Sequence, residues 1–526
     1  MAVTLDELPA GYYRSKNFIG STAAVCLMAI SLYLGYVLPV NSLTAIDEDL
    51  GPDPNYTMVS TVFTLISGVA LLLVGRLGDI FGRRYFLIAG QVCGLIGSIV
   101  CATAKNVPTV IGGSVLCGLA AAVQLTFTFV LAELVPNKTR PAVNAGIFVT
   151  TLPFAGFGAL IAEELIANTA RSWRWSYYLN IITCSLSTIL LACFYFPPGW
   201  DQKHRGESRW VGIKKLDYVG FTLYAAGVVL ILLGLSWGGT TYTWDSAHVV
   251  AVLVIGFVSL LAFALYETFV SIEQPILPLS LLRNPGYTAC VCSALVGNMV
   301  YFSMSILWPT AVAALFTTNA IHAGWLAVST GLGVLIGEVA GGLLMKPIGH
   351  SKYQLIAVTT GVTVFNGALA ALNEDRLVLG IAFTALGGFF VGYLEILTII
   401  MCPLYCAPED IGLASGFLGS AKQIAGTIAT AIFVAILDNR LESYAVINDT
   451  AYSDSFRTVF LSSIAFGGCA IIAAIFSISV DDKLDGTVAA KLGGEGSVDL
   501  VSDEEKAAEL EKGSDIEKAN DADSSN

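Results

Sequence analysis

Charged residues are scarce in this sequence, and their scarcity excludes most classes of soluble protein. Aspartate, glutamate, lysine and arginine make up only 13% of the 526 residues, whereas a typical soluble domain carries about 25%. There are only four histidines, and none of the 11 cysteines stands in a metal-type spacing such as C-x-x-C. We also find no nucleophile–base set and no phosphate-binding loop. The sequence therefore predicts neither an enzyme nor a bound metal or cofactor.

The net charge of −13 comes largely from one end of the chain. Residues 481–526 hold 14 acidic side chains and five lysines, which gives −9 for this segment (5 minus 14). The rest of the chain carries no strongly basic pattern, so nucleic acid is not an expected partner. Residues 481–526 are rich in small and acidic residues and have no core-forming pattern, which predicts a disordered acidic tail.

Hydrophobic sequence is what the chain has in abundance. Hydrophobic residues reach 55%, and the mean hydropathy is +0.73. Because lipid offers no partners to backbone N–H and C=O groups, a spanning segment is a helix of about 20 mainly apolar residues. We therefore predict an all-α membrane protein in which 14 apolar runs cross the bilayer: 18–40, 55–74, 85–103, 107–131, 142–163, 176–196, 217–236, 247–270, 287–314, 321–345, 353–372, 376–401, 411–437 and 456–480.

The distribution of lysine and arginine orients these runs. Most of the 27 positive residues fall in loops on the same side as the N-terminus, which the positive-inside rule assigns to the cytoplasm. Residues 1–17, the loop 197–216 and the acidic tail are then cytoplasmic. The long basic loop divides the chain into two six-helix bundles, 18–196 and 271–480, with two inserted helices at 217–270. The predicted order is therefore 6 + 2 + 6.

A short charged segment joins the second and third apolar runs. Residues 75–84 read G-R-L-G-D-I-F-G-R-R, a pattern that resembles the loop between helices 2 and 3 of the major facilitator superfamily. We expect a hairpin on the cytoplasmic face, in which the aspartate pairs with an arginine or caps a helix N-terminus. The resemblance implies an inner gate, and the alternative is a simple topology anchor. The gate residues would be Gly75, Gly78, Asp79, Gly82, Arg83 and Arg84.

The glycine frame of this segment recurs in the second half of the chain. Gly342 and Gly349, between the tenth and eleventh runs, repeat the spacing Gly-x6-Gly of Gly75 and Gly82. The tenth and eleventh runs are the second and third of the last six, so the repeat lies where a duplicated bundle would have it. This location favours two parallel six-helix halves around a central pathway.

Charged side chains inside the apolar runs are the sharpest functional signal, since each costs at least ~2.5 kcal/mol at mid-bilayer. These residues are Glu338, Glu395 and Lys422. Counted from the inner helix ends, Glu395 and Lys422 differ in depth by only ~6 Å, so they can pair across neighbouring helices. We hypothesise that Glu395 is the protonation site and that its pairing with Lys422 breaks when a proton binds. The alternative is a static ion pair that specifies packing.

Three polar residues within apolar runs are further candidates for lining a pathway: Gln124, Asn298 and Tyr301. For Gln124 the alternative is a helix–helix hydrogen bond, and for the aromatic residue it is packing or lipid contact. Asn448 begins an N-D-T glycosylation acceptor in an expected outer loop. Asn55 begins a second acceptor, which directly abuts a helix.

Several stretches together are similar to the fungal trichothecene efflux pump group of fourteen-helix major facilitators. The similarity spans roughly residues 40–480. It is carried by Glu395, Lys422 and the segments 45–55, 75–84, 118–124, 133–138, 173–180, 216–220 and 412–416. The resemblance implies the major facilitator fold and a fungal protein that exports toxic or secondary metabolites by proton antiport. The same group is also similar in sequence to siderophore–iron transporters, so the resemblance leaves that function open.

These features lead us to expect a monomeric, proton-coupled exporter of a small amphipathic organic compound. It would work by rocking two bundles in the lipid bilayer of the plasma or vacuolar membrane. Two alternatives stay open. One is siderophore–iron uptake by the same fold, and the other is a non-transporting nutrient sensor, which the lack of an apolar pattern in the tail disfavours.

Overall fold

The computed structural model describes most of the chain between its two ends. The described residues are 3–4, 12–53, 55–197, 214–238, 242–270, 275–277, 279–317, 319–407, 410–445, 451–484 and 487–488. The glycosylation candidate Asn448, most of the predicted loop 197–216 and most of the acidic tail lie outside the described residues.

The described part of the chain is almost entirely helical. The first helices are α1 (Lys16–Asn41), α2 (Leu43–Leu50), α3 (Met58–Phe81), α4 (Arg84–Ala102), α5 (Val107–Gln124), α6 (Phe127–Leu134), α7 (Arg140–Gly156), α8 (Gly158–Asn168) and α9 (Arg174–Phe194). The next are α12 (Tyr218–Trp237) and α13 (Ala247–Phe269).

The later helices follow without a long interruption. They are α14 (Leu279–Leu282), α15 (Pro285–Leu315), α16 (Ala320–Ile348), α17 (Ser351–Ala368), α18 (Leu377–Leu404), α19 (Ile411–Ala445) and α20 (Ala451–Ile475). Short 3-10 turns are η2 (Tyr12–Arg14), η3 (Leu369–Ala371) and η5 (Asp481–Lys483). Two short strands, β1 (Val3–Thr4) and β2 (Thr487–Val488), pair antiparallel.

The number of membrane-spanning helices agrees with the sequence. Among the described residues, 13 helices are long and apolar enough to cross a membrane, and the bent pair of α7 and α8 brings the number to 14. Each of the 14 predicted apolar runs has a counterpart in the structure. The prediction of an all-α membrane protein with 14 crossings is therefore confirmed.

The segment 75–84 is not the hairpin loop that its charges predicted. α3 does not end with the apolar run at residue 74 but continues through Asp79 to Phe81. Asp79 stays within the helix and pairs at 3.0 Å with Arg83, which lies just beyond the helix end. The reversal is made at Gly82, whose φ of +87° favours glycine. The predicted loop is thus the end of a helix followed by a tight turn.

Two predicted spans are interrupted. The fourth run breaks after Gln124, which separates α5 from α6. The fifth run bends by 42° at Phe157, between α7 and α8. Pro153, in the last turn of α7, has no N–H to give to the helical ladder, and a proline of this kind loosens a helix at the turn around it.

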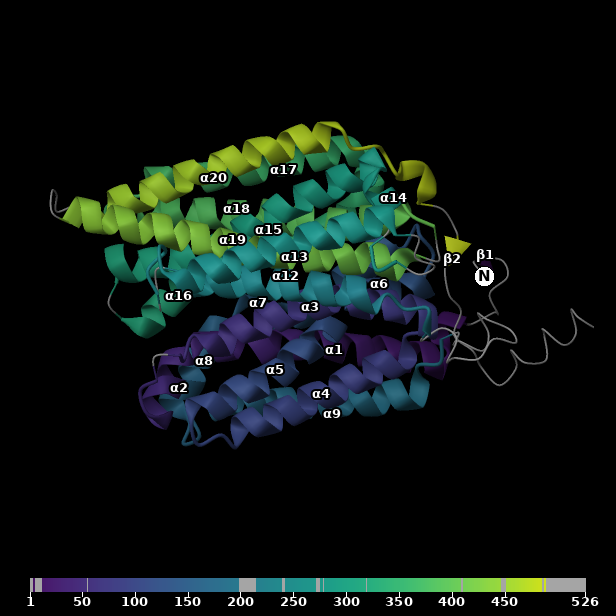
Figure 1. Ribbon diagram of the computed structural model, residues 1–526, viewed down its shortest axis with the longest axis horizontal. Coiled ribbons are helices and arrows are strands. Elements are labelled where there is room, and N and C mark those ends of the chain that lie inside the picture. Colours follow the sequence, from purple (N-terminus) through teal and green to yellow (C-terminus); the bar gives the residue numbers. More distant parts are fainter. Residues whose placement is uncertain are drawn as a thin grey trace, which may run out of the picture.

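The helices form two groups that lie side by side (Figure 1). The first contains α1 and α3 to α9, and the second contains α15 to α20. The groups meet where α3 packs on α19 and where α7 packs on α16. The inserted helices α12 and α13 pack on each other, and α12 also contacts α3 and α19. The inserted pair therefore lies on one of the two seams between the groups.

We name the two ends of the helix bundle after the glycines at which α3 and α2 end. We call the end where α3 finishes the Gly82 end, and the opposite end, where α2 finishes, the Gly51 end. The strands β1 and β2 pair beyond the Gly82 end (Figure 1). The first and last described residues of the chain thus lie on the same side of the bundle.

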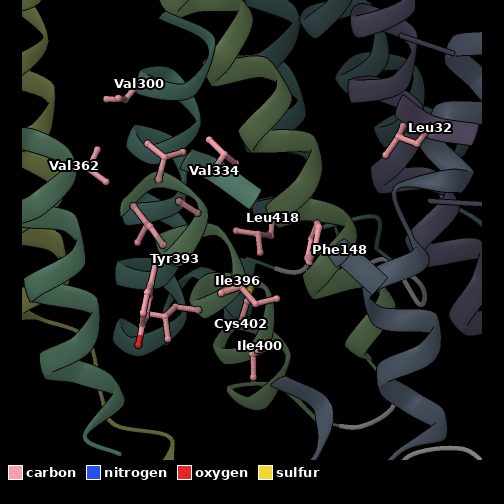
Figure 2. Close-up of a cluster of buried hydrophobic side chains, with 14 of the residues drawn as sticks. Leu32, Phe148, Val300, Val334, Val362, Tyr393, Ile396, Ile400, Cys402 and Leu418 are labelled. Atoms are coloured by element: carbon pink, nitrogen blue, oxygen red, sulfur yellow. The ribbon is translucent and has the colours of Figure 1, made fainter. Parts of the chain in front are cut away.

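A large hydrophobic core includes residues of both groups. Leu32 of α1 and Phe148 of α7 belong to it, as do Leu418 of α19 and Ile396 of α18 (Figure 2). The glycines and small residues of the seams let this core continue from one group to the other.

Candidate functional site

The two groups approach each other closely along α3 and α19 near the Gly82 end. A Cβ atom on Gly75 would collide with the backbone carbonyl oxygen of Gly412. One turn further along α19, a Cβ on Gly416 would meet the backbone of Leu71 at 3.0 Å. Only residues without side chains allow two helices to pack at this distance. This glycine contact joins the two groups at the Gly82 end.

Asp79 connects the end of α3 with the beginning of α19. Its Oδ1 accepts the backbone N–H of Gly412 at 3.2 Å, and its Oδ2 accepts that of Leu413 at 2.7 Å. Arg83 donates to the same carboxylate at 3.0 Å, and a Cβ on Gly78 would meet the Arg83 side chain at 3.2 Å. The first N–H groups of a helix are unpaired and partially positive, so a carboxylate is stabilising there. Asp79 therefore pairs with an arginine and caps a helix of the other group at once.

The neighbouring arginines differ in what they contact. Arg76 Nη1 lies 3.4 Å from Asp410 Oδ1, which makes a second ionic link between the groups. Arg84 donates to the carbonyl oxygen of Ala192 at 2.9 Å, and its guanidinium lies 3.9 Å from the centre of the Phe196 ring. Both of these partners belong to the first group. Arg84 thus lies outside the seam to which the sequence assigned it, whereas Arg76, from the same motif but not selected, is part of it.

The second group repeats the glycine contact. Gly342 on α16 lies against the carbonyl oxygen of Pro141, at the beginning of α7, much as Gly75 lies against the start of α19. Gly349 follows the end of α16 with a φ of +61°, as Gly82 follows α3. The repeated sequence frame therefore corresponds to a repeated contact between a helix of one group and the start of a helix of the other.

A cavity with a volume of about 100 Å³ lies between the two groups. Its lining comes from both groups and is mainly apolar: Leu32, Tyr33, Leu71, Leu125, Phe127, Thr128, Phe148, Asn298, Glu395, Ile399, Ser415, Leu418, Gly419, Lys422 and Gln423. Figure 2 shows three of the apolar lining residues, Leu32, Phe148 and Leu418, on different helices. An apolar wall with a few polar groups suits a small organic ligand.

An ion pair stands in the wall of this cavity. Lys422 Nζ of α19 donates to Glu395 Oε1 of α18 at 2.5 Å. Lys422 is 8% exposed and the side chain of Glu395 is 27% exposed, so water screens this pair only in part. Asn298 of α15 also lines the cavity, and its side-chain amide donates to the backbone carbonyl of Lys422 at 2.5 Å. The structure thus brings together three of the residues that the sequence singled out.

Glu338 is buried next to this pair. It is 2% exposed on α16, and its Oε2 has no hydrogen-bond partner in the described part of the chain. It interacts electrostatically with Glu395 and Lys422. A buried carboxylate without hydrogen bonds is costly in its ionised form. The site therefore holds two acids and one base, and only one of the acids is directly paired.

The other predicted pathway residues have different surroundings. Tyr301 of α15 interacts electrostatically with Glu395 and with Tyr36 of α1, but it is not among the lining residues of the cavity. Gln124 is buried inside the first group, where its amide donates to Gln91 of α4 at 3.3 Å. Gln124 thus makes the helix–helix hydrogen bond that was its alternative interpretation, and it does not line this cavity.

Sequence reasoning missed four polar residues of the cavity wall: Tyr33, Thr128, Ser415 and Gln423. Tyr33 of α1 lines the cavity and interacts electrostatically with Glu338 and Glu395. Gln423 of α19 also lines it, directly after Lys422. The only signal for Tyr33 is a hydroxyl group in the middle of an apolar run. That signal is weak, because aromatic side chains in such runs usually serve packing.

The glycosylation candidate Asn55 is exposed in the turn before α3, at the Gly51 end. Its side-chain amide donates to Asp53 Oδ1 at 3.2 Å, and its backbone N–H donates to the same oxygen at 2.8 Å. The amide nitrogen that would carry a glycan is therefore engaged within the turn.

Comparisons with known proteins identify the family of this chain. A family model described as "Fungal trichothecene efflux pump (TRI12)" matches residues 1–463. The chain belongs to this family. This TRI12 family member is 33% identical over 446 residues to the trichothecene efflux pump TRI12 of Trichoderma arundinaceum, covering 83% of this chain and 73% of that protein. It is 31% identical over 450 residues to the pump of the same name from Fusarium sporotrichioides, covering 84% and 74%.

Solved structures agree with the fold of this TRI12 family member. The proton:xylose symporter XylE, of the major facilitator superfamily, superposes with a TM-score of 0.57 at 15% identity, covering 89% of this chain and 96% of that one. The human organic anion transporter MFSD10 superposes with a TM-score of 0.56 at 13% identity, covering 86% and 100%. The predicted major facilitator fold is confirmed. The chain is a multi-pass membrane transporter from a family of efflux pumps.

Proposed function

We propose that this protein exports a small amphipathic organic compound, a fungal secondary metabolite or a xenobiotic, in exchange for protons. The efflux pump family and the relatives named trichothecene efflux pumps support export of such a compound. The observation that carries proton coupling is the ion pair of Glu395 and Lys422, 2.5 Å apart in the cavity wall. Ionisable side chains at this depth are costly and are usually retained for function.

Protonation changes the charge balance of the cavity wall. A proton on Glu395 makes this side chain neutral and removes the attraction that holds Lys422. Glu338 is a second candidate for the proton, since it interacts electrostatically with both partners and its Oε2 has no hydrogen-bond partner among the described residues. Substrate and proton act on the same helices, because the cavity is lined by α18 and α19 as well as by α1 and α7. Coupling of this kind typically amounts to about 1–3 kcal/mol.

Transport proceeds by alternating access, with the bundles 18–196 and 271–480 rocking against each other. To open the Gly82 end, α3 and α19 must separate. Separation breaks the hydrogen bonds from the start of α19 to Asp79 and the ionic contact of Arg76 with Asp410. Asp79 therefore acts as a latch that favours the closed state of this end.

The Gly82 end is the cytoplasmic end. The excess of lysine and arginine in the loops of this end supports the orientation, and both chain ends are then cytoplasmic. The protein acts as a monomer in the plasma membrane or the vacuolar membrane.

Sealed vesicles that contain the purified protein test the proposal. A labelled trichothecene and a labelled ferric siderophore are offered separately, under an imposed pH gradient with an acid interior. Protons leaving the vesicle should drive accumulation of the trichothecene, and a protonophore should abolish it. Accumulation of the ferric siderophore in place of the trichothecene, or trichothecene movement that ignores the gradient, would overturn the proposal.

A further inference from the structure

The inserted helices lie directly on the seam that must open. Apolar side chains of α3, α12, α13 and α19 form one buried cluster there: Leu65, Val69, Leu72, Tyr224, Val228, Leu232, Phe263 and Leu413. In the view of Figure 1, α12 and α13 cross the region where the two groups meet, and α12 contacts α3 and α19. Since α3 and α19 belong to different groups, α12 contacts both sides of the seam.

One hydroxyl group joins three of these helices. Ser420 Oγ of α19 lies 2.5 Å from Tyr224 Oη of α12 and 2.5 Å from the backbone carbonyl oxygen of Gly68 on α3. A carbonyl oxygen only accepts, so the single proton of Ser420 goes to Gly68. Tyr224 must then donate to Ser420. Both side chains are buried, with Ser420 fully inaccessible.

Ser420 lies on α19 between the capped N-terminus of this helix and Lys422, which belongs to the ion pair. The helix N-terminus at Gly412 and Leu413 is capped by Asp79, and Lys422, two residues after Ser420, pairs with Glu395. A displacement of Ser420 along α3 would therefore move both contacts together.

A longer-range electrostatic interaction links α13 to the same seam. Glu267, near the end of α13, interacts electrostatically with Arg76, the residue of α3 that pairs with Asp410. The carboxylate of Glu267 also accepts the backbone N–H groups of Ile276 and Leu277 at 3.1 and 3.2 Å. The chain that leaves α13 is thereby held close to the seam.

We propose that the inserted helices are part of the gate and that Tyr224 and Ser420 are positioning residues, which hold α19 against α3 while the Gly82 end is closed. The proposal rests on the proposed function in one respect, namely that α3 and α19 separate during transport. When they separate, α12 cannot stay on both. Opening must break either the bond of Tyr224 to Ser420 or the apolar contact of α12 with α3.

Distance measurements between spin labels test this proposal without any substrate. Labels replace Tyr85 at the start of α4 and Tyr353 at the start of α17 in a cysteine-free background; both residues are 68% exposed and belong to different groups. Opening of the Gly82 end lengthens this distance. Tyr224→Phe should raise the ratio of open to closed molecules by about two- to tenfold, the effect of one hydrogen bond. Ser420→Ala should raise it further, because it removes both bonds.

Matched variants separate positioning from general stability. Thr222→Val on α12 and Thr427→Val on α19 remove hydroxyl groups that bond only within their own helices, at 2.8 and 3.0 Å; neither should change the distances.

Asp79→Ala is the positive control for opening. If Asp79→Ala lengthens the distance and Tyr224→Phe, which removes a single oxygen atom, leaves it unchanged, the positioning role is wrong. If no variant lengthens it, the gate at this seam is itself wrong. If only the vesicle experiment failed, the proposed substrate or the proton coupling would be wrong, and the proposed role of α12 would stand.

Discussion

The carboxylate of Asp79 accepts the backbone N–H of Leu413 at 2.7 Å, although the two residues are 334 positions apart in the sequence. The last turn of one helix thereby caps the first turn of a helix in the other group. The carboxylate meets the partially positive helix end only while the two helices stay together. Hydrogen bonds of this kind can break and re-form, as a gate that opens and closes requires.

Replacing Asp79 by alanine should lower the transport rate at a normal amount of protein in the membrane. The closed Gly82 end loses a helix cap and a charge at a helix N-terminus, together about 1–2 kcal/mol. Transport into vesicles, divided by the amount of protein, measures the effect. Asp79→Asn still accepts an N–H but lacks the charge, so it should be intermediate. A wild-type rate for Asp79→Ala would contradict the latch.

Glu395→Gln should abolish the dependence of transport on the proton gradient, because an amide does not take up the proton. The measurement is substrate movement in vesicles over a series of imposed pH gradients. Glu374→Gln, a change on an exposed loop residue before α18, is the matched control and should behave like the wild type. Proton-driven transport by Glu395→Gln with an unchanged pH profile would exclude Glu395 as the proton site.

Removing the lysine of the ion pair should destabilise the protein. Lys422→Ala leaves the carboxylate of Glu395 in the cavity wall without its partner, at a cost of about 3 kcal/mol. The double variant Lys422→Ala with Glu395→Gln should recover most of this loss, since no charge then stays behind. Thermal unfolding in detergent measures both. Equal losses for the single and double variants would show that the pair contributes no electrostatic stability.

Adding a methyl group at the seam should weaken the contact between the groups. Gly75→Ala and Gly342→Ala each place a Cβ against a backbone carbonyl oxygen of the other group, which cannot give way without moving a helix. Gly112→Ala and Gly146→Ala are matched controls, because a Cβ at either position meets nothing within 4 Å. The controls should be neutral or gain up to about 1 kcal/mol. The unfolding temperatures of the four variants test this prediction. Equal temperatures for the seam variants and the controls would contradict it.

Stability at the Gly51 end should depend on pH through Asp49. Asp49 Oδ2 accepts Arg174 Nη1 at 2.5 Å and Trp173 Nε1 at 3.0 Å, and the hydrogen bond from Arg174 lowers the pKa of Asp49 below its ordinary 3.8. A lowered pKa means that the contribution is present above pH 3.8 and is lost as the pH falls further, through the pKa of the folded state.

The asparagine variant tests this pH dependence. The unfolding temperatures of the wild type and Asp49→Asn should differ at neutral pH and converge as the pH falls below about 3.8. A difference that persists unchanged in acid would show that the charge of Asp49 does not stabilise this end.

The sequence predicted much of the fold because the membrane imposes a local requirement. Every crossing needs a long apolar helix, so hydropathy alone gives the 14 crossings. It also gave the depth of Glu395 and Lys422, since helical rise per residue is constant. Hydropathy did not predict that α3 continues past the apolar run to Phe81, with Asp79 paired to Arg83 just beyond the helix end.

The face of a helix on which a residue lies was harder to predict. Gln124 and Asn298 are both polar residues within apolar runs. Gln124 bonds to Gln91 inside one group, whereas Asn298 lines the cavity and bonds to Lys422. Nothing local separates the two cases, because the outcome depends on which helix packs against which face.

Apolar length and motif spacing are properties of neighbouring residues, so the amino-acid sequence was enough to identify a helical membrane transporter of the TRI12 type. Three findings required the folded chain: Asp79 caps α19, Arg84 stays apart from that seam, and Tyr224 of an inserted helix bonds to Ser420. These contacts join residues far apart in the chain. Their formation depends on how closely glycines let helices approach and on how the helices are rotated about their axes, and neither is encoded in any single segment.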